Sequence, residues 1–284
     1  MIGVKFDGRL GNQLFQYVFL KYLKQREKSN TVFFINPHHA YIEKYFDLED
    51  SDNFLLASKP YSAITRVLPT ILQLKPVYIH NWIIPKEFII KNWSVYVGYF
   101  QSDYYYQQLQ KKPSFKIKQA YRDDFERLYG KLYRESKTVV VHIRRTDYMN
   151  YGERRKRDIS LPMAYFQKRL NAIENIQAYK VIFVSDDIKH VKAVFPAQPN
   201  YIFSENNEII DFQVIQNADI SIISNSTFAW WAAYLSPKKN IVYAPKNWFG
   251  FKINAEHPRG IMTDKFVWCD VLEDAESKMP KAIR

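Results

Sequence analysis

The sequence predicts an α/β protein made of two similar halves, each containing a parallel sheet. Short apolar strands alternate with helical segments along both halves, as in Rossmann-like folds. Several of these strands run directly into polar residues, where open α/β sheets place their ligands. We expect the halves to span 1–135 and 136–284 and to face each other across a cleft. The C-terminal segment is expected to pack back on the first half.

The order of elements supports this prediction in each half. In the first half we expect a strand at 3–6, a mostly buried helix at 12–28, a strand at 31–35, short helices within 40–95, a strand at 95–99 and helical sequence over 103–137. In the second half we expect strands at 139–143, 180–185, 201–203, 218–223 and 240–243, and helices at 162–175, 187–195, 208–217 and 227–235. The dinucleotide motif GxGxxG is absent from the sequence.

Composition and charge limit the class of protein. The 284 residues are 47% hydrophobic and carry a net charge of +12. This charge fits a solvated basic surface, a nucleic acid, an anionic bilayer or a phosphorylated substrate. The single cysteine, Cys269, rules out an intrachain disulfide and favours a reducing compartment, with burial its expected role. The sequence has neither a signal peptide nor a membrane span, so we expect a cytoplasmic protein.

Four strand ends carry polar residues: FDGRLGNQ, HIRRTDY, FVSDD and SIISNSTF. The last precedes an apolar helix, and its hydroxyls fit either ordinary helix capping or a phosphate site at the helix N-terminus. In HIRRTDY the alternation of a strand puts His142 and Arg144 on one side and Arg145 on the other. We therefore expect Arg144 to face a phosphate and Arg145 to brace the loop through Asp147. A purely structural Arg–Asp pair is the alternative.

Other polar motifs leave their roles open. Asn12 stands where a helix N-cap belongs, although its amide could orient a sugar hydroxyl instead. Ser185, Asp186 and the following Asp187 fit a metal, a ribose, a base edge or a capped helix start. The triplet Asp50-Ser51-Asp52 has the DxD form of metal-dependent sugar transferases, but no clear strand precedes it. We predict no metal site.

Four motifs of this sequence resemble, in the same order along the chain, those of the α-1,2-fucosyltransferases of glycosyltransferase family 11. They are GRLGNQLFQY, HIRRTDY, FVSDD and NSTFAWWAAYL. HIRRTD is also similar to a motif of α-1,6-fucosyltransferases and some protein O-fucosyltransferases. The resemblance covers about Val4 to Ala244 as spaced motifs. It implies a GT-B-like fold, with the first half on the acceptor side and the second binding the donor. The implied reaction is metal-independent, inverting transfer of fucose from GDP-β-L-fucose, most often to a galactose 2-hydroxyl.

The resemblance also assigns site residues. Arg144 resembles the arginine that binds the β-phosphate, and Asn12 the asparagine near the transferred sugar. Asp186 is placed for the nucleoside end, and Asp147 is the candidate base, with Asp7 as an alternative. The remaining expected donor contacts are Gly11, His142, Arg145, Ser185, Asn225, Ser226, Thr227 and Phe228. Asp7 departs from the family, which often has an uncharged residue there.

Two other functions compete with this prediction. The same donor could serve α-1,6 transfer or protein O-fucosylation, although the chain lacks extra modules and disulfides. A basic nucleic-acid-binding protein would explain the charge, but basic residues are dense only in KKPSFKIKQ and ERRKR, so we expect no nucleic-acid partner. The expected partners are GDP-fucose and a galactose-containing or lipid-linked glycan. We also expect peripheral contact with the inner face of an anionic membrane.

Overall fold

The computed structural model describes residues 1–28, 31–36, 40–48, 52–152 and 157–272. The chain divides into two compact units. Unit 1 comprises Met1–Gly130 and His257–Thr263, and unit 2 comprises Lys131–Glu256 and the chain from Asp264 onward. A segment near the C-terminus thus belongs to unit 1, where Arg259 N–H donates to the Asn81 carbonyl at 2.8 Å.

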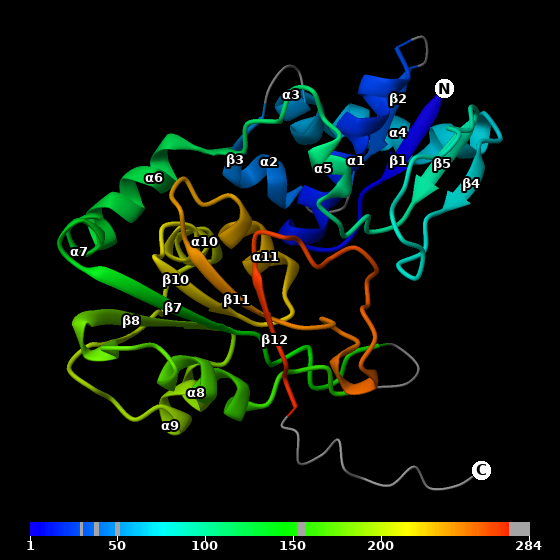
Figure 1. The fold of residues 1–284 in the computed structure, drawn as a ribbon. Coiled ribbons are helices and arrows are strands. Elements are labelled where there is room, and N and C mark those ends of the chain that lie inside the picture. Colours follow the sequence, from blue (N-terminus) through cyan, green and yellow to red (C-terminus); the bar gives the residue numbers. More distant parts are fainter. Residues whose placement is uncertain (29–30, 37–39, 49–51, 153–156, 273–284) are drawn as a thin grey trace, which may run out of the picture. The chain divides into compact units, whose positions relative to one another are not determined.

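Unit 1 is built on a parallel sheet with strand order β2-β1-β5-β4. The four strands of this sheet are labelled in Figure 1. A short antiparallel pair, β3 with β6, belongs to the same unit. The elements are β1 (Ile2–Lys5), α1 (Leu10–Arg26), β2 (Val32–Ile35), α2 (Tyr41–Tyr45), β3 (Phe46–Asp47), α3 (Asp52–Ala57), α4 (Lys59–Ile71), β4 (Lys75–Tyr78), β5 (Ser94–Val97), α5 (Tyr104–Gln107), β6 (Lys116–Ile117), α6 (Gln119–Phe125) and a π-helical turn (Glu126–Gly130).

The two faces of the unit 1 sheet are covered by different helices. Strand alternation sends Phe33 and Phe34 to opposite faces. Leu68 of α4 packs against the cluster of Phe33, Leu74 and Val95. Tyr96, which follows Val95 in β5 and so points to the other face, packs with Phe19 of α1 at 5.7 Å between ring centroids. Helix α1 is buried along most of its length, as its wide apolar stripe predicts.

Unit 2 is built on a six-stranded sheet with strand order β12-β11-β10-β7-β8-β9, and every pairing in it is parallel. Its elements are α7 (Lys131–Glu135), β7 (Lys137–Ile143), α8 (Met163–Asn171), a 3-10 turn (Ile176–Ala178), β8 (Tyr179–Ser185), α9 (Ile188–Val194), β9 (Tyr201–Phe203), α10 (Glu208–Gln216), β10 (Ile220–Ile223), α11 (Thr227–Tyr234), β11 (Ile241–Pro245), a 3-10 turn (Phe251–Ile253) and β12 (Val267–Cys269).

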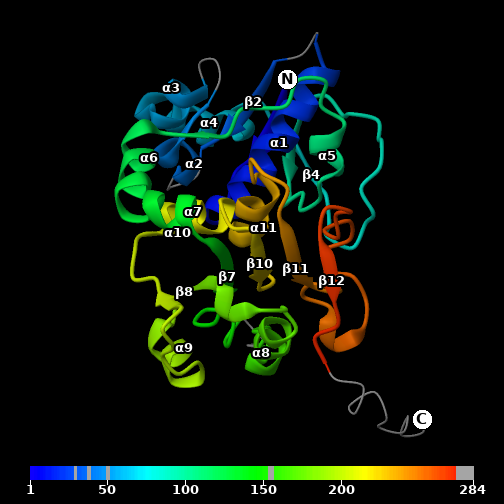
Figure 2. The ribbon, with the colours of Figure 1, turned by 60° about the vertical axis from the view of Figure 1, so that its left-hand side comes forward.

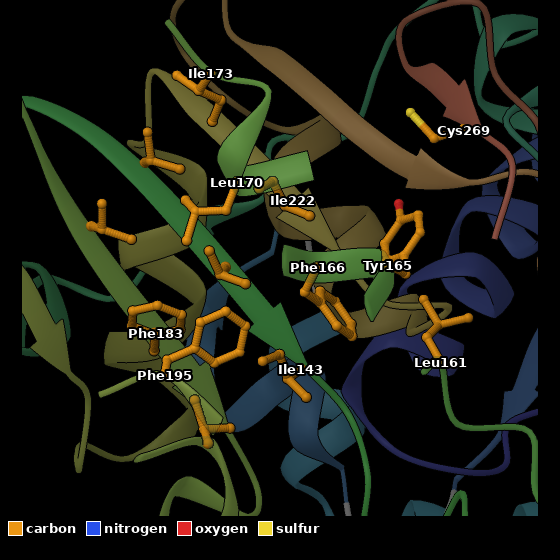
Figure 3. Packing of buried hydrophobic residues seen from close by; sticks show 14 of the residues in the cluster. Ile143, Leu161, Tyr165, Phe166, Leu170, Ile173, Phe183, Phe195, Ile222 and Cys269 are labelled. Carbon is orange, nitrogen blue, oxygen red and sulfur yellow. The ribbon is translucent and has the colours of Figure 1, made fainter. Parts of the chain in front are cut away.

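Helices cover both faces of this sheet, with α8 and α9 on one and α10 and α11 on the other (Figure 2). The first face holds a core in which Phe166, Leu170 and Phe195 pack against alternate strand residues such as Val141 and Phe183 (Figure 3). Because side chains alternate along a strand, His142 of β7 points to the α10 and α11 side. Its ring centroid lies 6.0 Å from that of Phe228 in α11, which confirms this direction.

Some expectations for the elements were wrong. The expected helical sequence at 103–137 is divided among short helices and strand β6. Strand β4 was missed because Pro76 makes it look like a loop, and β12 because it is short. Pro76 is tolerated because β4 is an edge strand. Helix α1 begins at Leu10, so its N-cap is Arg9 rather than Asn12.

Candidate active site

The candidate site in unit 2 begins where strand β7 ends. The register pairs His142 with Ile223 of β10 and Ile143 with Ser185 of β8, so three strands finish together. Ladder pairing stops after Ile143, and the chain turns over residues 146–150. The expected polar motifs of β7, β8 and β10 therefore meet at one sheet edge, as parallel pairing requires.

Arg144 is held by two carboxylates. Its Nε and Nη2 donate to the two oxygens of Asp147, both at 2.8 Å, in a bidentate pair. Its Nε also lies 3.3 Å from Asp186 Oδ2. Burial lowers the pKa of Arg144, but Asp147 and Asp186 outweigh it and leave the pKa raised. The guanidinium is thus a fixed cation whose orientation is set by its neighbours.

Arg145 has a different partner from the one expected. Its Nε lies 3.3 Å from Asp187 Oδ2, and Asp187 is also the N-cap of α9. The prediction that Arg145 braces the loop through Asp147 is therefore wrong, because Asp147 pairs with Arg144 instead. Arg145 does brace the scaffold, but it joins the turn to helix α9.

Asp186 organises the turn after β7. Its carboxylate accepts the backbone N–H groups of Arg145 at 2.9 Å and Thr146 at 3.2 Å, and the Thr146 hydroxyl donates to it as well. The Ser185 hydroxyl accepts the Asp187 N–H at 3.0 Å and shapes the neighbouring strand end. Asp186 thus positions the loop that carries Arg144, and a contact with the nucleoside end stays a prediction.

His142 and Ser224 form a buried pair beneath this loop. Ser224 Oγ lies 2.9 Å from His142 Nδ1 and accepts the Arg144 backbone N–H at 3.2 Å. Burial, aided by the positive charge of Arg144, lowers the pKa of His142 to about 4. The imidazole is therefore neutral near pH 7, and the pair holds the backbone of Arg144 without adding charge.

The N-terminus of α11 lies at the end of β10, in the same unit. Ser226 is its N-cap, but the Ser226 side chain makes no capping hydrogen bond. Asn225 is fully buried, and its Nδ2 donates to the Ile159 carbonyl at 2.9 Å. Thr227 and Phe228 begin the helix, and Phe228 stacks edge-on to Phe212 of α10. Free N–H groups at such an end favour an anion.

Aromatic residues flank Arg144 in a cluster that the sequence reading missed. Tyr148 lies 5.8 Å from the Arg144 guanidinium, and its hydroxyl donates to the Asn225 carbonyl at 3.1 Å. Tyr151 stacks on Phe249 with ring centroids 5.9 Å apart. Burial raises the pKa of Tyr148. Tyr148 thus ties the arginine turn to the α11 end.

The turn after β1 gathers the predicted residues of unit 1. Asp7 N–H donates to Gln16 Oε1 at 2.9 Å, and Gln16 Nε2 donates to the Gly98 carbonyl at 3.1 Å. Gly8 has a φ of +76°, and a Cβ there would lie 2.6 Å from Asn12 Nδ2. Asn12 Oδ1 accepts from Gln101 Nε2 at 2.9 Å. Gly8 is thus required both by its backbone angle and by the close amide of Asn12.

Asp52 has a structural role. Its carboxylate is buried, lies 2.8 Å from Lys21 Nζ and 3.2 Å from Lys24 Nζ, and accepts the Tyr17 hydroxyl at 2.9 Å. Although burial raises its pKa, the lysines and Tyr17 outweigh it and leave the pKa lowered. The first two residues of the DxD triplet, 50 and 51, lie outside the described residues, as do most of the ERRKR cluster.

The family model described as Glycosyl transferase family 11 matches residues 1–259. The chain belongs to glycosyl transferase family 11. The resemblance read from the four motifs is therefore confirmed at the level of the family.

The relatives of this chain are named for different activities. The chain is 29% identical to the O-antigen biosynthesis glycosyltransferase WbnK of Escherichia coli over 283 residues, covering 86% of this chain and 93% of the relative. It is 34% identical to an α-1,2-colitosyltransferase of Escherichia coli over 119 residues, covering 39% and 41%. It is 22% identical to galactoside α-(1,2)-fucosyltransferase 1 of Oryctolagus cuniculus over 248 residues, covering 81% and 62%.

Among solved structures, a family 9 glycosyl transferase from Veillonella parvula matches with a TM-score of 0.50 at 11% identity, covering 100% of this chain and 90% of that one. The fucosyltransferase NodZ from Bradyrhizobium has a TM-score of 0.48 at 13% identity, covering 83% of this chain and 93% of that one. Together with the two parallel sheets, the first likeness confirms the predicted GT-B-like α/β fold. The expected cleft between the halves stays a prediction.

The structure groups the predicted site residues by unit. Those that it brings together in unit 2 are His142, Arg144, Arg145, Asp147, Ser185, Asp186, Asn225, Ser226, Thr227 and Phe228. Gly11, Asn12 and Asp7 belong to unit 1. Ser224, Thr146 and Tyr148 were missed as supports of the arginine turn. The position of Ser224 directly after a central strand could have indicated its role.

Proposed function

We propose that this family 11 glycosyltransferase moves L-fucose from GDP-β-L-fucose to a galactose 2-hydroxyl with inversion. The observation that supports this most is the fixed cation Arg144 at the carboxyl end of β7, in the same cluster as the N-terminal end of α11. An arginine fork and helix N–H groups are complementary to a diphosphate. The four motifs and the family match agree with a sugar-nucleotide donor.

The proposed chemistry follows from where charge develops. When the bond from the sugar to the β-phosphate breaks, negative charge grows on the departing GDP. Donors already fixed toward that charge stabilise the transition state more than the ground state. We propose that Arg144, Ser226 and Thr227 supply these donors, and that no metal is required. Inversion needs a base near the acceptor hydroxyl, for which Asp147 and Asp7 are the proposed candidates.

Arginine substitution at the turn tests this proposal. Arg144→Ala should lower kcat by about 100-fold or more, since removal of one fixed donor to a developing oxyanion costs that much. Arg127→Ala is a matched control, because Arg127 also pairs with an aspartate three residues away but is exposed. Transfer within a few-fold of the unaltered protein in Arg144→Ala would contradict the leaving-group role.

A second donor is favoured by one observation. The match to the α-1,2-colitosyltransferase has the highest identity of the three relatives reported above, although it covers 39% of the chain. Colitose is fucose without its 3-hydroxyl, so one site could accept either sugar. Parallel assays with GDP-fucose and GDP-colitose, at equal concentrations and with one galactoside, would rank the donors by kcat/KM. A preference of about 10-fold or more for GDP-colitose would replace fucose in the proposal.

The acceptor and the linkage are tested separately. The O-antigen relative favours a glycan acceptor, which we propose is galactose-terminated and lipid-linked. NMR of the isolated product distinguishes an α-1,2 linkage from the alternative α-1,6 linkage. Fucose found on a polypeptide serine or threonine would instead support protein O-fucosylation.

We also propose peripheral contact with the inner face of an anionic membrane. None of the described helices combines the length and apolar character needed to cross a bilayer. The net charge of +12 favours attraction to anionic lipid. The exposed apolar side chains of unit 1 indicate which surface would make this contact.

A further inference from the structure

Exposed apolar side chains are concentrated in one stretch of unit 1. Of the sixteen large hydrophobic residues exposed within the described chain, ten lie between residues 54 and 93. These ten are Phe54, Ile64, Val67, Ile71, Tyr78, Trp82, Ile83, Ile84, Ile89 and Trp93. Single exposed apolar residues are ordinary on protein surfaces, but a contiguous group marks an interaction site.

Helix α4 turns an ordered apolar stripe to solvent. Ile64, Val67 and Ile71 are 57%, 53% and 69% exposed. At 3.6 residues per turn they fall within an arc of about 60° on the helix. The adjoining side of α4 buries Thr65 and packs Leu68 against the sheet residues Phe33 and Val95. The outer stripe is therefore apolar although the helix is already anchored by its inner side. We call Ile64, Val67 and Ile71 the α4 outer stripe.

Trp93 directly precedes strand β5, next to the start of β4, which is the strand that follows α4. Its carbonyl accepts the N–H of Lys75, the first residue of the strand that follows α4, at 3.0 Å. The Trp93 side chain is 57% exposed. Tryptophan is enriched at membrane–water interfaces, where one part of its ring is apolar and another wet.

The stretch of sequence that contains α4 carries charge of one sign. Residues 53–86 contain Lys59, Arg66, Lys75 and Lys86 but no aspartate or glutamate. An apolar helix face with basic residues beside it is typical of helices that lie in the interface of an anionic bilayer. A protein partner would need an acidic rim around an apolar groove, whereas an anionic lipid surface supplies both properties over any area.

A second copy of this chain fits the same surface less well. Its own stripe would bring the same basic residues together, and like charges oppose such an interface. Pairing through the sheet edge is also disfavoured, because edge strand β4 carries Lys75 and Pro76. The lipid surface is therefore the occupant that the charges favour.

We propose that the α4 outer stripe inserts into the interface of an anionic phospholipid bilayer and docks unit 1 on it. This rests on the proposed function, since a lipid-linked acceptor would lie at that surface. The basic residues attract the headgroups, and the three aliphatic side chains enter the acyl boundary. Each aliphatic residue lost should weaken partitioning by about 10-fold, from the free energy of burying such a side chain.

Vesicle flotation with a matched pair of triple variants tests the surface. Ile64→Ser, Val67→Ser, Ile71→Ser removes the stripe, and Ile241→Ser, Ile253→Ser, Val267→Ser removes two isoleucines and one valine that are exposed in unit 2. With vesicles of phosphatidylglycerol and phosphatidylcholine at low salt, the first should lose binding and the second keep it. Equal binding of the stripe variant and the unaltered protein would overturn the proposal.

A labelled single-site variant gives a direct reading that does not depend on the triple variant folding. The one native cysteine, Cys269, is buried, so a dye sensitive to polarity reacts selectively at Val67→Cys. Its emission should shift to the blue with anionic vesicles, whereas the same dye at Ile253→Cys should not shift. No shift at residue 67 overturns the proposal. A shift without vesicles that grows with protein concentration would also overturn it, in favour of a second copy.

Activity on a water-soluble galactoside separates this proposal from the proposed function. The stripe variant should transfer sugar to the soluble acceptor at the rate of the unaltered protein. If no variant transfers fucose but vesicle binding follows the stripe, the proposed reaction fails and the docking surface stands. If transfer occurs while the stripe has no effect on vesicle binding, the docking surface fails alone.

Discussion

The turns that follow β1 and β7 come from equivalent places in two parallel sheets but are held by different chemistry. In unit 1, neutral amides hold the turn: Gln16 joins Asp7 to Gly98, and Asn12 accepts from Gln101. In unit 2, ions hold it, since Arg144 and Arg145 pair with Asp147 and Asp187. The difference indicates that the second turn is built to present a fixed positive charge.

Amides and ion pairs also tolerate substitution differently. A buried amide that loses its partner leaves an unsatisfied polar group, so the cost falls on stability. A cluster of ions that loses one member is left with uncompensated charge, which changes both orientation and electrostatics. We therefore expect substitutions in unit 2 to affect catalysis first, and those in unit 1 to affect folding first.

After Arg144→Ala, the largest effect is expected at Asp186. Asp186→Ala removes the acceptor of the Arg145 and Thr146 N–H groups, so the turn no longer holds Arg144 in place. We expect kcat/KM to fall by about 100-fold, because small displacements of catalytic groups cost that much. Steady-state kinetics of Asp186→Ala and Asp186→Asn measure it. A fall in the melting temperature with unchanged kcat/KM would contradict the difference between the turns.

The counterpart in unit 1 is Gln16, which is buried. Gln16→Ala removes the hydrogen bonds that this buried amide makes to the Asp7 N–H and the Gly98 carbonyl. It should lower the free energy of unfolding by about 1–2 kcal/mol, since two partly buried hydrogen bonds are lost. Gln25→Ala is the matched control: Gln25 also makes two bonds, to Gln108 and Gln110, but in exposed positions. Urea denaturation compares them, and equal losses would show that burial is irrelevant here.

His142 should make the stability of unit 2 depend on pH. Its pKa of about 4 in the fold lies below its ordinary value, so the unfolded chain takes up a proton first as pH falls. The free energy of unfolding should therefore fall between about pH 6.5 and 4, by about 1.4 kcal/mol per pH unit at most. His142→Gln should reduce this slope in denaturation series across that range.

Asp211 should change the stability of unit 2 with pH in the opposite direction from His142. Burial raises the pKa of Asp211 to about 7, against the effect of its bond from Ser204. Its ionisation thus favours unfolding as pH rises from about 4 to 7. Asp211→Asn should raise the melting temperature at pH 8 and leave it nearly unchanged at pH 4. The opposite pattern would mean that the carboxylate is stabilised in its ionised form.

The smallest effect is expected at Asp147. Asp147→Asn replaces the carboxylate that holds Arg144 with a neutral group, so the guanidinium should bind the donor a few-fold more tightly. The KM for GDP-fucose would then fall, while kcat falls by more if Asp147 is the base. The ratio of the two changes therefore separates a holding role from a base role.

The sequence allowed prediction of which motifs lie together better than of how their side chains pair. The alternation of strands and helices predicted a parallel sheet, and so it predicted that the motifs after β7, β8 and β10 meet at the carboxyl end of that sheet. The two-residue alternation of side chains along a strand predicted the face to which His142 points. That periodicity ends at Ile143, so it could not assign partners to Arg144 and Arg145. Those partners depend on a turn whose shape is set by Asp186, a residue distant in sequence. Likewise, Arg9 displaced Asn12 as N-cap because the helix begins earlier than its apolar pattern.

The bidentate pair of Arg144 with Asp147 has a consequence for the pace of repeated reaction cycles. A diphosphate that takes both arms of the fork must displace a carboxylate tethered three residues away. The same carboxylate returns at a high effective concentration when the product loosens. Under the proposed function, an internal competitor of this kind weakens the binding of substrate and product alike. It therefore shortens the residence time of GDP, which is more anionic than GDP-fucose because its terminal phosphate is free.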